Sequence, residues 1–253
     1  MVHILRAIPV QSLKLLVFDL DGTLIDSAQD LCNSVNATLA QFGREPLPDT
    51  MVASYIGDGA IMLVRRALFG PDAAESGAAE SGAPVDEQLL AAAYAFFLDY
   101  YRQHKLDFTY AYEGVLEALA ALRQLHDQPQ GKAPLMAVLT NKPVRPAQAI
   151  CEALHLAPFF LRVYGGNSFQ SKKPDPEGLL ALMNEAGARP EETVMIGDSQ
   201  VDVETARNAG AWCVGCTFGL APDSLTAFPP DILVDSPADW TTALGAAKIN
   251  TEP

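Results

Sequence analysis

The chain has 253 residues, with 17 Lys and Arg against 31 Asp and Glu, so its formal net charge at pH 7 is −14. Its hydrophobic share of 49% is enough to form a core, which excludes an intrinsically disordered chain. The negative surface argues against binding to nucleic acid, whose affinity depends on Lys and Arg. At long range it also disfavours an anionic small molecule, unless a local positive site overrides the net field.

No segment predicts a membrane span or an export signal. The longest apolar run, 89–98, is shorter than the roughly 18–20 residues that a bilayer requires, and no small-residue cleavage site follows the N-terminal segment. We therefore expect a cytoplasmic protein that does not bind membranes and has reduced cysteines. Cys213 and Cys216 form a C-x-x-C, but a strand would direct the two thiols to opposite faces, so we interpret them as structural.

In chain order, the first predicted element is a buried strand over 15–18, and the segment that follows it is helical. Ser27 can cap a helix whose apolar residues recur at helical spacing as far as Phe42. Further helices are predicted over 60–69 and about 86–104, with no candidate strand between them. We therefore predict an all-helical cap over 27–108, inserted into an α/β core made of 1–26 and 109–253. Within the insert, 73–82 is a tandem duplication that we assign to a loop without function.

After the insert, apolar runs alternate with amphipathic segments. The predicted helices are 115–125, 143–154, 176–186 and 200–209, and the predicted strands are 135–139, 162–164, 193–196, 212–216 and 232–234. Strands that are apolar throughout are typical of a parallel sheet covered on both faces. We therefore predict the α/β class, with a Rossmann-like parallel sheet flanked by helices.

Polar side chains follow two of these strands where each strand ends. Asp19 and Asp21 lie two residues apart after 15–18, so on a strand they share a face at the carboxyl edge, where such sheets bind ligands. Thr140 and Asn141 follow 135–139 and are suited to hydrogen-bonding the oxygens of an anion. Each feature alone has a simpler interpretation. An Asp such as Asp19 or Asp21 could belong to a turn or cap a helix, and Thr140 and Asn141 are ordinary residues at the end of a strand.

Two further motifs point to the same edge. Lys172 and Lys173 precede a proline-braced loop, and Asp198 and Asp202 stand four residues apart on the first turn of a predicted helix. Alone, the lysines would be solvated and the acids would be helix caps. Because four strand ends carry such groups together, we favour a site. Three carboxylates, those of Asp19, Asp21 and Asp198, would repel one another without a cation, and Mg²⁺ is the hard cation that suits oxygen ligands and phosphate.

Together these motifs resemble the four motifs of the haloacid dehalogenase superfamily of phosphotransferases. DLDGT resembles the first motif, Thr140 the second, Lys173 the third and GDSQVD the fourth, and the resemblance covers nearly the whole chain. The helical insert resembles the small helical cap of that superfamily. Within it, 55–68, 112–122, 139–143 and 171–180 look most like bacterial phosphoglycolate phosphatases.

The resemblance implies a Mg²⁺-dependent phosphomonoester hydrolase. Asp19 would attack phosphorus to give an aspartyl-phosphate, and Asp21 would act as general acid and then general base. Thr140, Asn141 and Lys173 would bind the phosphate. The metal would be held by Asp19, Asp198 and the backbone carbonyl of Asp21, with Asp202 in support. Dehalogenases of the superfamily lack an Asp at position 21, which favours cleavage of a phosphate ester over a carbon–halogen bond.

The resemblance names a small phosphorylated metabolite as the substrate, with 2-phosphoglycolate first. In the cap, Gly57 and Gly59 stand at the start of a predicted helix whose backbone N–H groups could receive a carboxylate, and Arg65 would add positive charge. Alternatively, the glycines only allow close packing of the cap on the core, and the arginine is solvated. The competing functions are a sugar-phosphate phosphatase or phosphomutase of the same superfamily and a non-catalytic binding module. The sequence does not indicate an oligomeric state.

Overall fold

The computed structural model describes residues 1–71, 73, 84–125 and 133–245. Except for Ala73, the duplication at 73–82 lies outside these residues. Across the described ranges, no helix combines the length and the apolar character needed to cross a bilayer.

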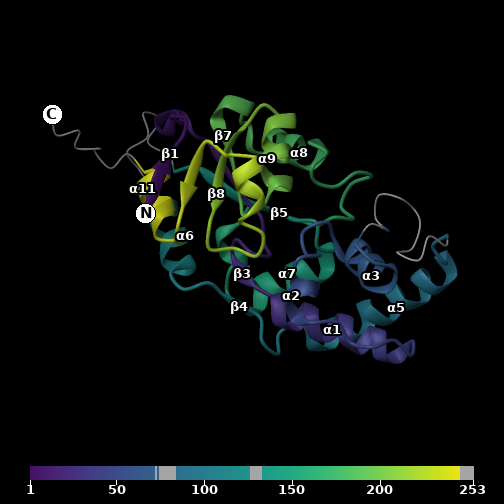
Figure 1. Cartoon of the computed structure of the whole chain (residues 1–253). Coiled ribbons are helices and arrows are strands. Elements are labelled where there is room, and N and C mark those ends of the chain that lie inside the picture. The colour runs from purple at the N-terminus through teal and green to yellow at the C-terminus, as the bar shows by residue number, and fades with distance from the viewer. Residues whose placement is uncertain (72, 74–83, 126–132, 246–253) are drawn as a thin grey trace.

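The core is built on one seven-stranded sheet, shown in Figure 1. In sheet order its strands are β1 (Val2–Ile4), β9 (Ile232–Val234), β8 (Trp212–Cys216), β7 (Thr193–Gly197), β2 (Leu15–Phe18), β5 (Leu135–Leu139) and β6 (Val163–Tyr164). All neighbouring strands are parallel except β1, an edge strand that pairs antiparallel with β9 and that the apolar pattern did not predict. The predicted α/β class with a mainly parallel sheet is confirmed.

Helices cover both faces of the sheet, because its strands are apolar on both sides. On one face lie α6 (Val115–Arg123), α7 (Val144–Ala153) and α11 (Asp239–Leu244), and on the other lie α8 (Glu177–Ala186), α9 (Gln200–Asn208) and α10 (Ser224–Ala227). Leu16 and Phe18 of β2 pack into the first layer, and Leu15 and Val17 pack into the second. The predicted elements agree with these bounds to within two residues at each end.

The C-x-x-C of β8 follows the same alternation. Cys216 packs into the layer that contains α6 and α7, whereas Cys213 packs into the layer that contains α8 and α9. Both thiols are free and buried, and burial raises their pKa values. The structural interpretation of this motif is confirmed.

The segment 27–108 contains helices α1 (Ala28–Gln41), α2 (Asp49–Ala53), α3 (Ala60–Phe69) and α5 (Glu87–His104), and its described residues form no strand. Figure 1 shows these helices together, to one side of the seven-stranded sheet. A two-stranded ribbon, β3 (Ile25–Asp26) with β4 (Tyr110–Ala111), joins the segment to the core at both of its ends. The assignment of 27–108 as a separate cap domain stays a prediction.

The buried Asp30 of α1 ties the two ends of the helical segment together. Its carboxylate accepts hydrogen bonds from the backbone N–H groups of Phe108 and Thr109 and from the Thr109 hydroxyl, the last at 2.7 Å. Asp30 and Thr109 are separated by nearly the full length of the insert. Their contact therefore holds the start and the end of the helical segment next to each other.

One expectation about this segment is wrong. Ser27 does stand at the start of α1, but its side chain makes no capping hydrogen bond. Instead, its hydroxyl donates to Asp21 at 2.5 Å, and the first helical N–H, that of Ala28, donates to Asp26 at 3.0 Å. The Asp26 carboxylate thus accepts from the helix start in place of Ser27, whose hydroxyl is turned toward the charged acceptor Asp21.

Candidate active site

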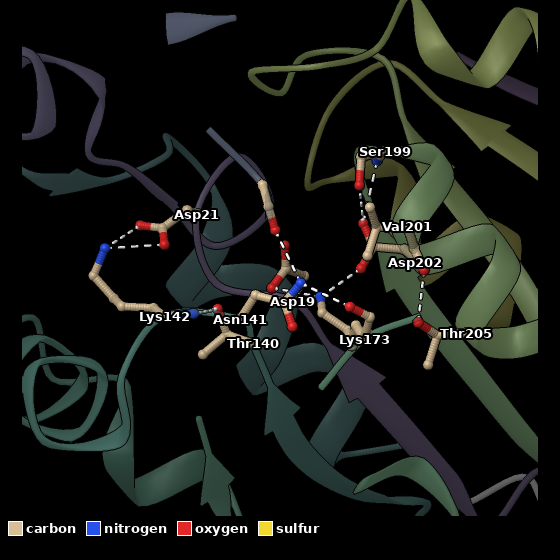
Figure 2. A network of polar contacts seen from close by, with 11 residues as sticks. Asp19, Asp21, Thr140, Asn141, Lys142, Lys173, Ser199, Val201, Asp202 and Thr205 are labelled. Carbon is tan, nitrogen blue, oxygen red and sulfur yellow. Dashed lines mark hydrogen bonds and ion pairs between the residues drawn. The ribbon is translucent and has the colours of Figure 1, made fainter. Parts of the chain in front are cut away.

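Three adjacent strands in the middle of the sheet deliver the predicted site residues to one edge. Strand β2 lies between β5 and β7, and Phe18 is level with Val138 and Ile196 on those neighbours. The residues that follow these strands therefore meet at the carboxyl edge, among them Asp19, whose N–H donates to the carbonyl of Ile196 at 2.8 Å. The structure brings together Asp19, Asp21, Thr140, Asn141, Lys173 and Asp202, which Figure 2 shows. Asp198 lies in the same cluster as Asp19 and Asp202.

Lys173 is a buried cation between two carboxylates. Its Nζ lies 2.8 Å from Oδ1 of Asp19 and 2.6 Å from Oδ1 of Asp202. Burial opposes the ammonium charge, but the two carboxylates outweigh it and raise the pKa of Lys173 above its ordinary value. Of the two candidate lysines, Lys173 contacts Asp19. Lys172 instead donates to the backbone carbonyl of Asp58, which lies in the helical segment 27–108, called the cap segment from here on.

Asp19, Asp198 and Asp202 form a buried carboxylate cluster, with one oxygen of each within 4.8 Å of the others. Burial first, and then repulsion by the neighbouring carboxylates, raises the pKa of Asp198 to about 8. Burial is also the main cause that raises the pKa of Asp19 to about 6. A cluster that resists its own ionisation in this way fits a divalent cation, which would neutralise the charge. The side chain of Asp21 lies outside this cluster.

Two of these acids are positioned by the backbone around them. The amide N–H groups of Leu220 and Ala221 donate to Oδ2 of Asp198 at 2.7 and 3.0 Å. Asp202 accepts from the N–H and hydroxyl of Ser199 at 3.2 and 2.9 Å, which makes it the capping partner at the start of α9. Capping was the simpler interpretation of Asp202, and the geometry shows that capping and membership of the cluster coexist.

Asp21 has a partner that the sequence did not predict. Nζ of Lys142 lies 2.8 and 2.9 Å from its two carboxylate oxygens, and the Lys142 side chain is only 4% exposed. Burial opposes the ammonium charge, but Asp21 prevails and raises the pKa of Lys142. The same Nζ lies 4.8 Å from the ring centroid of Tyr101 in α5. The only feature of the sequence that could have indicated a role for Lys142 at the site is its position directly after Thr140 and Asn141, where the strand ends.

Asn141 links the core to the cap segment. Its Nδ2 donates to the carbonyls of Gly57 and Lys173, both at 3.0 Å. A Cβ atom on Gly59, whose φ is +87°, would lie 2.9 Å from the backbone oxygen of Asn141. This close approach supports the packing interpretation for Gly59, whereas a Cβ atom on Gly57 would meet nothing within 4 Å. A role of the two glycines in anion binding stays a prediction.

Arg65 is not brought to the other predicted site residues. Its guanidinium pairs with Glu87 at 2.7 Å, and Arg65 is absent from the described residues that line the cavity. The neighbouring Arg66 pairs with Asp58 at 2.5 Å. Both guanidinium groups are therefore engaged by acids of the cap segment.

A small cavity of about 50 Å³ lies between the sheet edge and the cap segment. The core contributes polar groups to it, and the cap contributes mainly apolar ones. Its lining residues include Asp19, Asp21, Thr140, Asn141, Lys142 and Asp198 from the core and Leu31, Gly57, Gly59, Leu63, Phe97, Leu98 and Tyr101 from the cap.

Comparison with known proteins gives consistent matches. A family model described as haloacid dehalogenase-like hydrolase matches residues 16–216. Phosphoglycolate phosphatase of Pseudomonas putida is 39% identical over 224 residues, 88% of this chain and 76% of that protein. The protein of the same name from Chromobacterium violaceum is 36% identical over 91% of this chain and 96% of its own length. The crystal structure of a predicted phosphoglycolate phosphatase from Haemophilus somnus has a TM-score of 0.79 at 31% identity, covering 91% of this chain and 97% of that one.

These similarities confirm the predicted superfamily and the predicted class of enzyme, a phosphatase. The matched range contains the whole carboxylate cluster and both buried lysines of the site. The chain therefore belongs to the haloacid dehalogenase-like hydrolase family.

Proposed function

We propose that this hydrolase is a Mg²⁺-dependent phosphomonoesterase that acts through an aspartyl-phosphate, with 2-phosphoglycolate as its first candidate substrate. The observation that carries the proposal is the presence of two carboxylates, Asp19 and Asp21, on the wall of one cavity, each held by its own buried lysine. Relatives named phosphoglycolate phosphatase, at 35–39% identity, support the choice of substrate.

The chemistry assigns one role to each carboxylate. An oxygen of Asp19 attacks phosphorus, the bond from phosphorus to the ester oxygen breaks, and Asp21 gives that leaving oxygen its proton. Water then attacks the same phosphorus, Asp21 takes the proton of the water, and the bond to Asp19 breaks to release inorganic phosphate. Lys173 and Thr140 would hold the phosphoryl oxygens during both steps.

The carboxylate cluster is where a metal would bind. Asp19, Asp198 and Asp202 offer buried oxygens, and the backbone carbonyl of Asp21 is a further candidate. A bound Mg²⁺ would offset the negative charge that otherwise repels a phosphate ester from this edge of the sheet. The fit of the cluster to a cation, together with the family match, supports this cofactor.

The size of the cavity supports a small substrate. Its volume is about 50 Å³. A phosphorylated two-carbon acid, as the smaller ligand, suits so small a space better than a hexose phosphate does.

The test is phosphate release from a panel of small phosphomonoesters, with Mg²⁺ and with EDTA. We expect 2-phosphoglycolate to be hydrolysed fastest, and only with the metal. Asp19→Asn should lower kcat by about 10³-fold or more without loss of folding, whereas the control Asp99→Asn, at an exposed site, should leave it unchanged. Parent-level activity in Asp19→Asn would overturn the mechanism. An isomerised hexose phosphate in place of free phosphate would indicate a phosphomutase.

A further inference from the structure

We propose that Lys142 and Tyr101 form a subsite for the carboxylate of the substrate, which makes both of them specificity-determining residues. The inference rests on the proposed function and deepens it. It names phosphorylated hydroxy acids, and not simple alkyl phosphates, as the preferred substrates.

The cavity needs a cation for a second anionic group, and Lys142 supplies it. Among the described residues that line the cavity, Lys142 is the only Lys or Arg, since Lys173 lies behind Asp19 and Arg65 lies outside. Its ammonium group has three N–H donors, and two suffice for the contacts with Asp21 at 2.8 and 2.9 Å. The third lies beside the Tyr101 hydroxyl, so the ammonium group stands at the cavity wall, where it can attract an anionic group.

Tyr101 offers a second donor beside this lysine. The residue is 3% exposed and lines the cavity. Its hydroxyl oxygen lies beside the ammonium group of Lys142, and its O–H has no acceptor among the described residues. A buried O–H donor without an acceptor is costly, so a ligand that accepts from it binds with that advantage. Burial raises the pKa of Tyr101 to about 12, which keeps the proton available for donation. Because Tyr101 is in α5, the subsite joins the cap segment to the core.

The arrangement around Asp19 gives the substrate a direction. Figure 2 shows the pair of Asp21 and Lys142 on one side of Asp19, and Lys173 with Asp202 on the other. With phosphorus at Asp19, the ester oxygen faces Asp21 and the remainder of the substrate extends toward Lys142. In a phosphorylated two-carbon acid, one methylene separates the ester oxygen from the carboxylate, which matches the direct contact between Asp21 and Lys142.

The apolar walls make the recognition selective for charge. Leu31, Leu63, Phe97 and Leu98 surround the subsite on the cap side. In such a poorly hydrated space an ammonium group attracts a carboxylate more strongly than it does in water. A substrate that carries a methyl group at the same place would offer no negative charge to the Lys142 ammonium group and no acceptor to the Tyr101 O–H.

The experiment compares two substrates that differ only in this group, 2-phosphoglycolate and ethyl phosphate. We expect the parent to prefer 2-phosphoglycolate in kcat/KM by at least about 10-fold, as the loss of a charged hydrogen bond implies. Lys142→Met should raise KM for 2-phosphoglycolate by about 10- to 100-fold and change that for ethyl phosphate by less than about 3-fold. Lys142→Arg should restore part of the preference, and Tyr101→Phe should reduce it. Lys105→Met, which removes a partly exposed cation directly after α5 and away from the cavity lining, is the matched control.

Each outcome decides between distinct conclusions. Equal losses for both substrates in Lys142→Met, confined to kcat, would overturn the subsite, because they would mean that the lysine acts only through Asp21. A parent that hydrolyses both esters equally well would overturn it also, while the proposed phosphatase activity would stand; this comparison needs no variant to fold. A parent that releases phosphate from no monoester in Mg²⁺ would instead refute the proposed function itself.

Discussion

The carboxylate cluster makes a direct prediction about the stability of the metal-free protein, through the substitution Asp198→Asn. In the folded chain, burial and then the charges of Asp202 and Asp19 raise the pKa of Asp198 from an ordinary 3.8 to about 8. In the unfolded chain the same carboxyl ionises near its ordinary value. Without a metal, the folded protein therefore keeps a proton at neutral pH that the unfolded chain releases.

The sign and size of the effect follow from proton linkage. Between the two pKa values the folded state binds more protons than the unfolded state, so the free energy of unfolding falls as the pH rises. The slope is about 1.4 kcal/mol per pH unit for one proton, which makes about 2–3 kcal/mol between pH 5 and pH 7. An asparagine at position 198 has no proton to lose, and its amide oxygen can still accept from Leu220 and Ala221. The variant should thus gain about 2–3 kcal/mol relative to the parent over that interval.

The assay is urea unfolding in EDTA at pH 5, 6 and 7, with Asp99→Asn as a control whose carboxylate is 63% exposed. We expect the difference between Asp198→Asn and the parent to grow with pH, and the difference for the control to stay constant. Addition of Mg²⁺ should then raise the unfolding midpoint of the parent but not that of Asp198→Asn. A pH-independent difference between variant and parent would refute the reasoning, because it would mean that Asp198 is already ionised in the folded, metal-free protein.

Two further predictions concern the junction of the cap segment with the core. Gly59→Ala should lower the free energy of unfolding by about 1–3 kcal/mol, because its φ of +87° and a Cβ 2.9 Å from a backbone oxygen are both unfavourable. Gly43→Ala, with a φ of +67° and open space around it, is the control, and equal losses in urea unfolding would contradict the role of the close contact. Asp30→Ala should cost about 2–4 kcal/mol, because it leaves the buried N–H of Thr109 and its neighbour without an acceptor. The exposed Asp99→Ala should cost less than about 0.5 kcal/mol, and a similar value for Asp30→Ala would show that this carboxylate does not hold the junction.

The strands and the residues that end them were predictable because the information is local. Each buried strand is a short apolar run bounded by polar residues or glycine, as 15–18 and 193–196 illustrate, and both elements are observed at these positions. In a parallel sheet, all carboxyl ends lie along one edge, so Asp19, Thr140 and Asp198 had to be near one another once the strands were neighbours. The order of the strands, which places β2 between β5 and β7, makes that proximity immediate.

Side-chain partners at the site were not predictable, because they depend on contacts between residues far apart in the chain. Lys142 reaches Asp21 across 121 positions, and no local pattern separates it from a solvated lysine. Ser27 had the sequence of a helix cap and instead donates to Asp21. Arg65 had the charge expected of a substrate ligand, but the orientation of α3 pairs it with Glu87.

The net charge of −14 also illustrates the difference between what the sequence determines and what the tertiary structure determines. The sequence by itself determined the α/β class, the order of the elements and the set of acids and lysines at the strand ends, because apolar periodicity and strand polarity are properties of the chain. Only the tertiary structure decided how the charges combine: three carboxylates converge to fit a cation, Lys173 joins Asp19 to Asp202, and Lys142 pairs with Asp21 at the cavity. The Coulomb energy of an ion pair depends on the distance between its two charges and on their burial, so the pairs that form depend on packing and not on composition.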